Sequence, residues 1–164
     1  MSKNFLGDLD FGKEGEKVVE EILNKRTDAL KVLNEKGLDL RDDTTWQKIE
    51  VKSDRWTLRT GNICLELWSQ VEMRSEGWFQ HSPAEVLAYV LYDQKGYKAE
   101  TVLFYNFIGL RDFIYWNILK GDWNYDNPSL GKITNAKWGG AKNARNLLVP
   151  QDKIKLFLLE SITL

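Results

Sequence analysis

Cysteine and histidine, two residue types that often build functional sites, are nearly missing from this 164-residue chain, which has only Cys64 and His81. One cysteine cannot close an internal disulfide, and with one histidine it cannot complete a cysteine–histidine zinc cluster. We therefore expect Cys64 to be buried filler in an apolar strand. No nucleophilic triad can be built around His81. We expect His81 in an ordinary surface position, and the alternative is a loop position from which it contacts a substrate.

Long apolar runs and an excess of charge are absent too. No stretch approaches the length of a membrane-spanning helix, and the first residues carry no apolar secretory segment. Lysine and arginine number 23 against 24 acidic residues, a net charge of −1. This balance argues against tight non-specific binding of nucleic acid but not against catalysis on it. We expect one domain over residues 1–164, cytoplasmic and without a membrane partner.

Three charged residues in the stretch 37–54 share a strand-like spacing. Strand side chains alternate between faces, so Glu50 and Lys52 should point away from the apolar residues between them. Asp39 alternates in the same way in the segment before. The apolar residues of this alternation are Leu38, Leu40, Ile49 and Val51. If the two segments are neighbouring strands, Asp39, Glu50 and Lys52 project from one face.

This trio suits phosphate chemistry around a hard cation. Two carboxylates that converge repel each other unless a cation lies between them, and magnesium prefers such oxygen ligands. A nearby lysine can orient a water molecule or stabilise developing phosphate charge. The plainer interpretation is a solvated hairpin face, on which alternating charges are common.

Asp39 followed by Glu50-Val51-Lys52 resembles the motif of the PD-(D/E)xK nuclease superfamily. Leu38 stands where the name of the family has proline, which members often lack. The resemblance implies an α/β, restriction-endonuclease-like fold, with a mixed central sheet flanked by helices. It also implies hydrolysis of phosphodiester bonds with Mg²⁺ or Mn²⁺, most often in DNA. Asp39 and Glu50 would then hold the metal and Lys52 would orient the water.

A glutamate of the first predicted helix is a further metal-ligand candidate. The apolar stripe of residues 12–25 predicts a helix, with Glu16 at the edge of the stripe and Glu20 farther toward solvent. The Gly12-x-x-x-Glu16 spacing resembles the resolvase-like branch of the superfamily, which implies that Glu16 completes the metal site. Glu20 stays open as the alternative.

Three more acids are weaker candidates. Glu66 lies in the apolar strand pattern 62–68, where an unpaired charge is costly to bury. Gly61-Asn62 with Glu66 resembles a phage-type subgroup of the superfamily, which makes Glu66 a second-rank site residue; the alternative is a structural partner of Lys52 or of a backbone amide. Asp42 and Asp43 would replace Asp39 if the strand register differed, but we expect them in an exposed turn.

The other elements follow from apolar periodicity. The patterns predict the element order α-β-β-β-β-α-β-α-β-β. After the first helix, the strands are expected at 28–33, 38–41, 48–52, 62–68, 101–107, 146–149 and 155–162, and two further helices at 85–92 and 110–119. Ser82-Pro83 resembles a helix start and supports the helix over 85–92.

The segment 129–149 is the best candidate for a substrate rim, because it has four cations and no acid. Its candidate substrate-binding residues are Lys132, Lys137, Trp138, Lys142 and Arg145. Cations neutralise phosphates, and an exposed indole can stack on an unpaired base. An ordinary solvated loop is the alternative.

The alternatives at the level of function are a catalytically inactive nucleic-acid-binding or interaction protein on the same fold, and an unrelated interaction module. The sequence leaves open whether the DNA is duplex, single-stranded or branched, and whether the protein forms a homodimer. The subgroup resemblance favours a phage-encoded protein.

Overall fold

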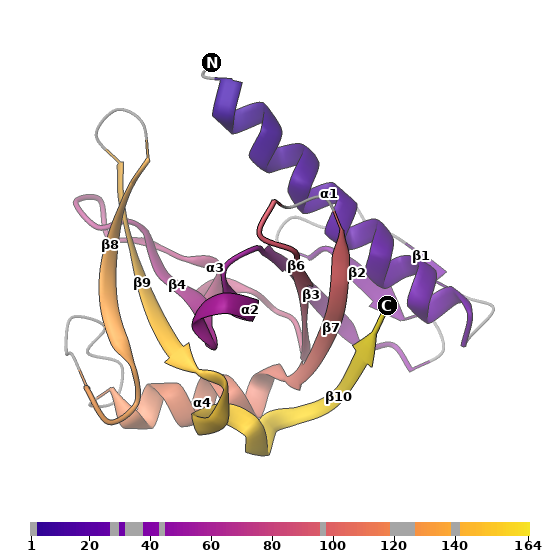
Figure 1. Cartoon of the computed structure of the whole chain (residues 1–164). Helices are drawn as coiled ribbons and strands as arrows, with labels where there is room; N and C mark the ends of the chain where they lie inside the picture. Colours follow the sequence, from indigo (N-terminus) through magenta and orange to yellow (C-terminus); the bar gives the residue numbers. More distant parts are fainter. Residues whose placement is uncertain are drawn as a thin grey trace.

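The chain forms two β-sheets with helices packed around them (Figure 1). The computed structural model describes residues 3–26, 30–31, 38–42, 45–95, 98–118, 127–138 and 142–164. The helices are α1 (Lys3–Asn24), α2 (Thr57–Thr60), α3 (Trp78–His81), α4 (Phe107–Asn117) and the 3₁₀-helix η1 (Gln151–Phe157). The strands are β1 (Leu30–Lys31), β2 (Leu40–Asp42), β3 (Lys48–Asp54), β4 (Asn62–Gln70), β5 (Ser75–Glu76), β6 (Val86–Tyr92), β7 (Ala99–Asn106), β8 (Lys132–Trp138), β9 (Lys142–Pro150) and β10 (Leu158–Thr163).

The larger sheet is mixed and has six strands in the order β1-β2-β3-β6-β7-β10. Its β3 and β6 run parallel, and its other neighbouring pairs are antiparallel. The smaller sheet is antiparallel, with the order β5-β4-β9-β8. The α/β class with a mixed sheet flanked by helices is thus confirmed, but the chain builds two sheets where one was expected.

Strand β6 occupies the place where a helix was predicted. All seven of its residues, VLAYVLY, are buried, because β3 and β7 flank the strand and other elements cover both sheet faces. The helix over 85–92 was therefore wrong. A short run that is apolar on both faces fits a buried strand as well as a buried helix, and the β-branched and aromatic residues favour the strand. Ser82-Pro83 follows α3 and does not begin a helix.

Helix α1 covers one face of the larger sheet (Figure 1). Its Val19 and Ile22 pack against Leu40, Ile49 and Val51, as the apolar stripe predicted. The helix begins at Lys3, well before the predicted start at Gly12. Since α1 buries one face of β3, the alternate residues of β3 point to the opposite face.

The opposite face of the larger sheet packs against the smaller sheet and α4. Ile63, Leu65 and Leu67 of β4 share one apolar cluster with Leu87 of β6 and Leu110 of α4. A polar link joins the sheets at the edge of this cluster. The Tyr89 hydroxyl donates to Asp54 Oδ2 at 3.0 Å and accepts the Cys64 backbone N–H at 3.1 Å.

The remaining predicted elements differ from the structure mainly at their ends. Strand 101–107 is β7, and helix 110–119 is α4, which starts at Phe107. Of the predicted strand 28–33, the described part is β1. Strand 155–162 is β10 preceded by η1, and the segment predicted as a loop before residue 146 forms β8 and the first four residues of β9. Paired backbone hydrogen bonds, invisible in the polar sequence of β8, stabilise that hairpin.

Within the described ranges, no helix has both the length and the apolar character needed to cross a membrane.

Gly77, in the turn between β5 and α3, should tolerate an added methyl group less well than Gly12 in α1. A Cβ added at Gly77 would lie 2.6 Å from the Glu66 backbone carbonyl carbon, whereas one added at Gly12 in α1 meets no described atom within 4 Å. We expect Gly77→Ala to lower the free energy of unfolding by about 2 kcal/mol, because the added methyl group would force the backbone of β4 at Glu66 and that of residue 77 apart. Gly12→Ala, the control, should raise it by roughly 0.5–1 kcal/mol through helix propensity. Urea denaturation measures both, and equal effects would contradict this packing.

Candidate functional site

The candidate site lies on the face of β3 that looks toward the smaller sheet. Ile49 and Val51 pack under α1, so Glu50 and Lys52 alternate onto the opposite face. Strand β3 therefore places the Glu50 carboxylate and the Lys52 ammonium group side by side, as the sequence predicted.

Asp39 reaches this site from the edge of the larger sheet. The residue lies just before β2, and its Oδ2 accepts the Val51 backbone N–H at 2.7 Å. The backbone pairing of β2 with β3 ends at Leu40 and Ile49. Beyond this point, the Asp39 carboxylate takes the place of a backbone carbonyl as the acceptor for the Val51 N–H. The same Oδ2 lies 3.8 Å from Lys52 Nζ.

The expected alternation before β2 was wrong in one respect. Leu38 belongs to the cluster between the sheets and Leu40 to the cluster under α1, so these leucines do not share a face. Leu38 and Asp39 precede the strand, and strand alternation does not govern them. Asp39 meets Lys52 because of its hydrogen bond to β3.

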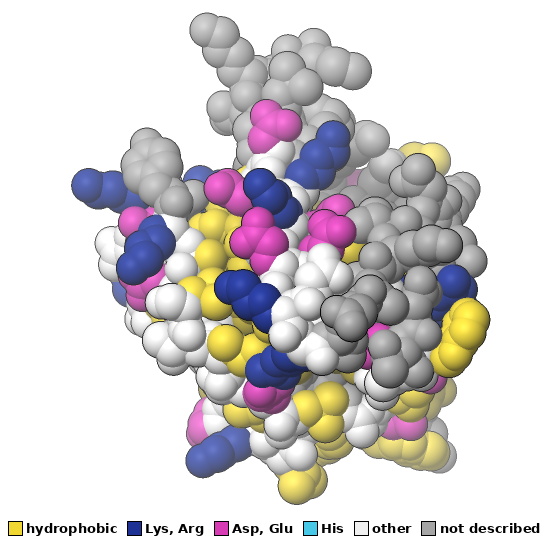
Figure 2. All heavy atoms as spheres, turned by 90° about the vertical axis from the view of Figure 1, so that its right-hand side faces the viewer, with side chains coloured by type: hydrophobic (Ala, Val, Ile, Leu, Met, Phe, Trp, Pro, Cys, Tyr) yellow, Lys and Arg dark blue, Asp and Glu magenta, His cyan; other side chains and the backbone are white. Residues whose placement is uncertain are grey.

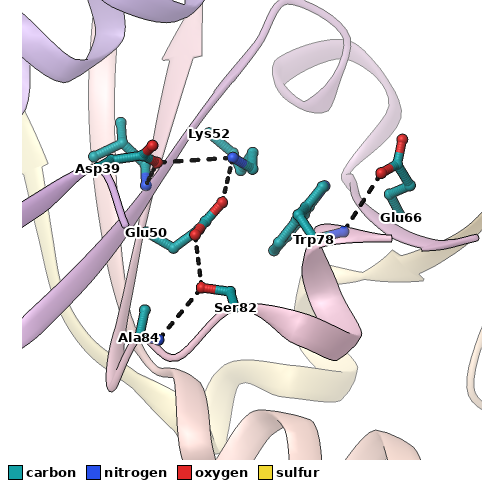
Figure 3. A network of polar contacts seen from close by, with 8 residues as sticks. Asp39, Glu50, Lys52, Glu66, Trp78, Ser82 and Ala84 are labelled. Carbon is teal, nitrogen blue, oxygen red and sulfur yellow. Dashed lines mark hydrogen bonds and ion pairs between the residues drawn. The ribbon is translucent and has the colours of Figure 1, made fainter. Parts of the chain in front are cut away.

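Glu50 is the most deeply buried acid of the site, with 5% of its surface exposed. Its Oε1 forms a short ion pair with Lys52 Nζ. Its Oε2 accepts a hydrogen bond of 2.6 Å from the hydroxyl of Ser82, which is also buried (Figure 3). Ionised carboxylates are costly to bury without such partners. Lys52 and Ser82 together satisfy both oxygens of Glu50.

The Trp78 ring also contacts Lys52, in addition to the carboxylates of Asp39 and Glu50. The Lys52 ammonium lies 5.1 Å from the centre of the Trp78 ring, a distance that fits a cation–π contact. Glu66 holds this part of α3, because its Oε1 accepts the Trp78 backbone N–H at 3.4 Å (Figure 3). Of the two roles considered for Glu66, the structure shows the contact with a backbone amide, on the far side of Trp78 from Lys52.

Glu16 in α1 stands within electrostatic reach of the trio. Partial burial is the main cause that raises the pKa of Glu16, and the charge of Asp39 raises it further. Lys52 and Lys13 oppose this effect, and Glu50 adds to it. Asp39 and Glu50 pair with the Lys52 ammonium, and the charges of all three also act on Glu16. Glu20 is half-buried one turn farther along α1.

Cys64 is not a nucleophile in this setting. Burial, followed by the charges of Asp54 and Glu66, raises the pKa of its thiol to about 12, so the thiol stays protonated at neutral pH. Its backbone takes part in the link through Tyr89 described above. His81 is exposed at the end of α3.

The other candidates lie apart from the trio or outside the description. Asp42 was expected in an exposed turn but is the half-buried last residue of β2, where it accepts hydrogen bonds from the backbone N–H and hydroxyl of Thr45. Asp43 is outside the described residues. Lys132 is exposed on β8, and Arg145 Nε donates to Asn135 at 3.3 Å within the β8–β9 hairpin. The side chains of Lys137, Trp138 and Lys142 lie outside the described part of the chain.

The donor chemistry of the site fits a hard divalent cation, because the carboxylates of Asp39 and Glu50 converge on the position of one ammonium group. The arrangement differs from a ready metal site. Lys52 Nζ takes up the position between Asp39 and Glu50, and among the residues described here no three acids, histidines or cysteines are placed to hold one ion.

Comparisons of the chain with models of protein families, with curated proteins and with solved structures found no match.

Sequence reasoning missed Ser82 and Trp78, although both contact the trio. Ser82-Pro83 was interpreted as a helix start, which drew attention away from the serine hydroxyl. Trp78 has no such signal in the sequence, because the tight approach of Gly77 to β4 that positions it is visible only in the structure.

The contact between Ser82 and Glu50 predicts a specific loss of stability. Ser82→Ala removes the donor to Glu50 Oε2 and leaves a buried carboxylate oxygen unpaired, which should cost about 1–3 kcal/mol. The control is Ser161→Ala on β10, an exposed serine, which should change the free energy of unfolding by less than about 0.5 kcal/mol. A Ser82→Ala protein as stable as the control would show that Glu50 does not depend on this hydroxyl.

The raised pKa of Glu16 predicts how stability depends on pH. Above that pKa, ionised Glu16 is less favourable in the folded than in the unfolded chain, so Glu16→Gln should raise the melting temperature at pH 7. The difference should disappear as the pH falls below the ordinary glutamate value, where Glu16 is protonated in both states. Glu21→Gln, on the exposed side of α1, serves as the control. Thermal unfolding at several pH values measures the effect, and a pH-independent difference would contradict it.

Proposed function

We propose that this protein is a metal-dependent nuclease of the PD-(D/E)xK type, with a restriction-endonuclease-like core, that hydrolyses phosphodiester bonds in DNA. The observation that carries the proposal is the convergence of Asp39, Glu50 and Lys52 from separate segments onto one face of the sheet. The sequence motif required this convergence, and carboxylates on opposite faces would have removed the proposal.

Asp39 and Glu50 would hold Mg²⁺ or Mn²⁺, with Glu16 as a further ligand and Glu20 as its alternative. Such an ion lowers the pKa of bound water and neutralises phosphate oxygens. The Lys52 ammonium would move from between the two carboxylates toward the substrate. There it would orient the attacking water and stabilise the charge that develops on the phosphate.

The partners of the trio, buried Ser82 and partly buried Trp78, support a role beyond an ordinary hairpin face. A solvated face needs no hydroxyl against its glutamate and no indole against its lysine. Here Ser82 fixes Glu50 and Trp78 limits the positions of Lys52. Side chains that are held in this way fit the positioning requirement of a catalytic site.

The charge distribution favours a local contact with nucleic acid. Figure 2 shows basic and acidic side chains interspersed over the coloured part of one face. With a net charge of −1, binding over the whole surface is disfavoured. The basic residues of the β8–β9 hairpin, Lys132, Lys137, Lys142 and Arg145, with Trp138, remain the substrate rim that the sequence suggests.

Cleavage assays test the function directly. We expect the protein to cleave at least one of plasmid, single-stranded or junction DNA with Mg²⁺ or Mn²⁺ and not with chelator. The charge-removing variants Asp39→Asn, Glu50→Gln and Lys52→Gln should each lose at least about a hundredfold in rate, because each removes a charge used in the transition state. Agarose and denaturing gels follow the products.

The control for this assay is Glu76→Gln, an exposed acid on β5 that should cleave at the wild-type rate. Circular dichroism of each variant separates loss of folding from loss of chemistry. Cleavage in chelator would overturn the proposal, as would no cleavage with any metal and substrate.

A second function, a binding protein that has lost the chemistry, is favoured by one observation. Lys52 forms ion pairs with both carboxylates, so the trio is neutralised in part without a metal. Calorimetric titration with Mg²⁺ distinguishes the two functions. A nuclease should bind the ion and lose this binding in Asp39→Asn, whereas the binding protein should show no heat of binding at the trio.

A further inference from the structure

Two exposed tryptophans, each beside an arginine, stand at the two ends of β3. Trp46 precedes the strand and is 66% exposed, with the Arg41 guanidinium 5.0 Å from its ring centre. Trp56 follows the strand and is 55% exposed, with the Arg59 guanidinium 4.7 Å from its ring centre. Large indole rings are usually packed more deeply, so two such pairs on one strand need an explanation.

Arg41 of the first pair lies on the face of the sheet that carries Glu50 and Lys52, and α2, which carries Arg59 of the second pair, packs on the same side. Arg41 is the partner of Lys48 in the β2–β3 pairing and alternates with Leu40, which packs under α1. Arg41 and Lys48 therefore share the face of Glu50. At the other end of β3, Thr57 ties α2 to β4 on the same side through its hydroxyl, which donates to the Asn62 carbonyl at 2.7 Å.

The backbone at Trp46 indicates a built feature. Its φ of 62° lies in the left-handed region, which is unfavourable for a bulky side chain. Asp42 holds the turn in place: its carboxylate accepts two hydrogen bonds from Thr45, and its N–H donates to the Gln47 carbonyl at 3.0 Å. Such strain persists where the surroundings enforce it, and it concentrates at functional sites. Here the strain presents an indole to solvent and not to the core.

We propose that Trp46 and Trp56 are stacking platforms for unpaired bases of one nucleic-acid strand, which crosses the edge of the site where Lys52 and Asp39 are partly exposed. This inference rests on the proposed function, because it places a phosphodiester bond at that site. Indole rings stack on bases of any sequence, and the adjacent Arg41 and Arg59 add positive charge for the backbone phosphates. The seven residues of β3 span about 20 Å, enough for several nucleotides between the two rings. In a duplex the bases stack on one another, so the rings select single-stranded or unpaired DNA.

Fluorescence anisotropy with a fluorescein-labelled oligothymidylate in chelator tests the inference without cleavage. Trp46→Ala and Trp56→Ala should each weaken binding of the single strand about tenfold or more, and change binding of the oligothymidylate–oligoadenylate duplex much less. Trp46→Phe should retain most of the affinity. The control is Trp116→Ala on α4, a tryptophan that is 62% exposed and should leave binding unchanged.

The outcomes separate this inference from the proposed function. Unchanged single-strand binding in both alanine variants overturns the inference even if the protein cleaves DNA, as does an equal loss for the single strand and the duplex or for the Trp116→Ala control. Selective loss of single-strand binding supports it, also in a protein that cleaves no DNA with any metal. In that case the stacking surface stands and the nuclease proposal falls.

Discussion

The burial of Glu50 is the constraint on which the candidate site depends. An ionised carboxylate at this depth is stable only if both oxygens have partners, and these come from different parts of the chain. Lys52 comes from the same strand and Ser82 from the segment after α3. The position of Ser82 is held in turn, because its carbonyl accepts a hydrogen bond of 2.6 Å from Arg111 in α4. Through Ser82, the Glu50 carboxylate on β3 therefore connects the larger sheet to the segment after α3 and to Arg111 of α4.

The smaller sheet gives the site its second wall. Strand β4 lies close enough to the turn before α3 that only glycine fits at position 77, and Glu66 accepts the next backbone N–H. These contacts place the Trp78 ring beside Lys52. Glu66, the acid in an apolar strand, is thus explained by what it positions. Glu66 accepts a hydrogen bond from the Trp78 backbone, and it affects Lys52 only by helping to position the Trp78 ring.

The acids of the site have opposing consequences for stability and for function. Burial and the charges of Asp39 and Glu50 raise the pKa of Glu16, and Lys52 and Lys13 act against them. Such a cluster costs stability unless it serves to bind a cation or a substrate group. The same tension applies to Trp46, whose left-handed backbone is held by the turn at Asp42. Both features lie next to β3, the strand that carries the proposed site.

The sequence by itself determined the local patterns: the apolar stripe of α1, the alternation in β3 that separates Val51 from Glu50, and the buried residues of β4. These follow from short-range periodicity, which one chain segment reveals. Only the tertiary structure decided that Val86–Tyr92 is a strand, that β4 belongs to a second sheet, and that Ser82 and Trp78 meet the charged pair of β3. A run that is apolar on both faces has no period that distinguishes strand from helix, and contacts between distant segments depend on how the layers pack. Asp39 belongs to both groups, because the motif identified the residue but a hydrogen bond to Val51 placed it beside Lys52.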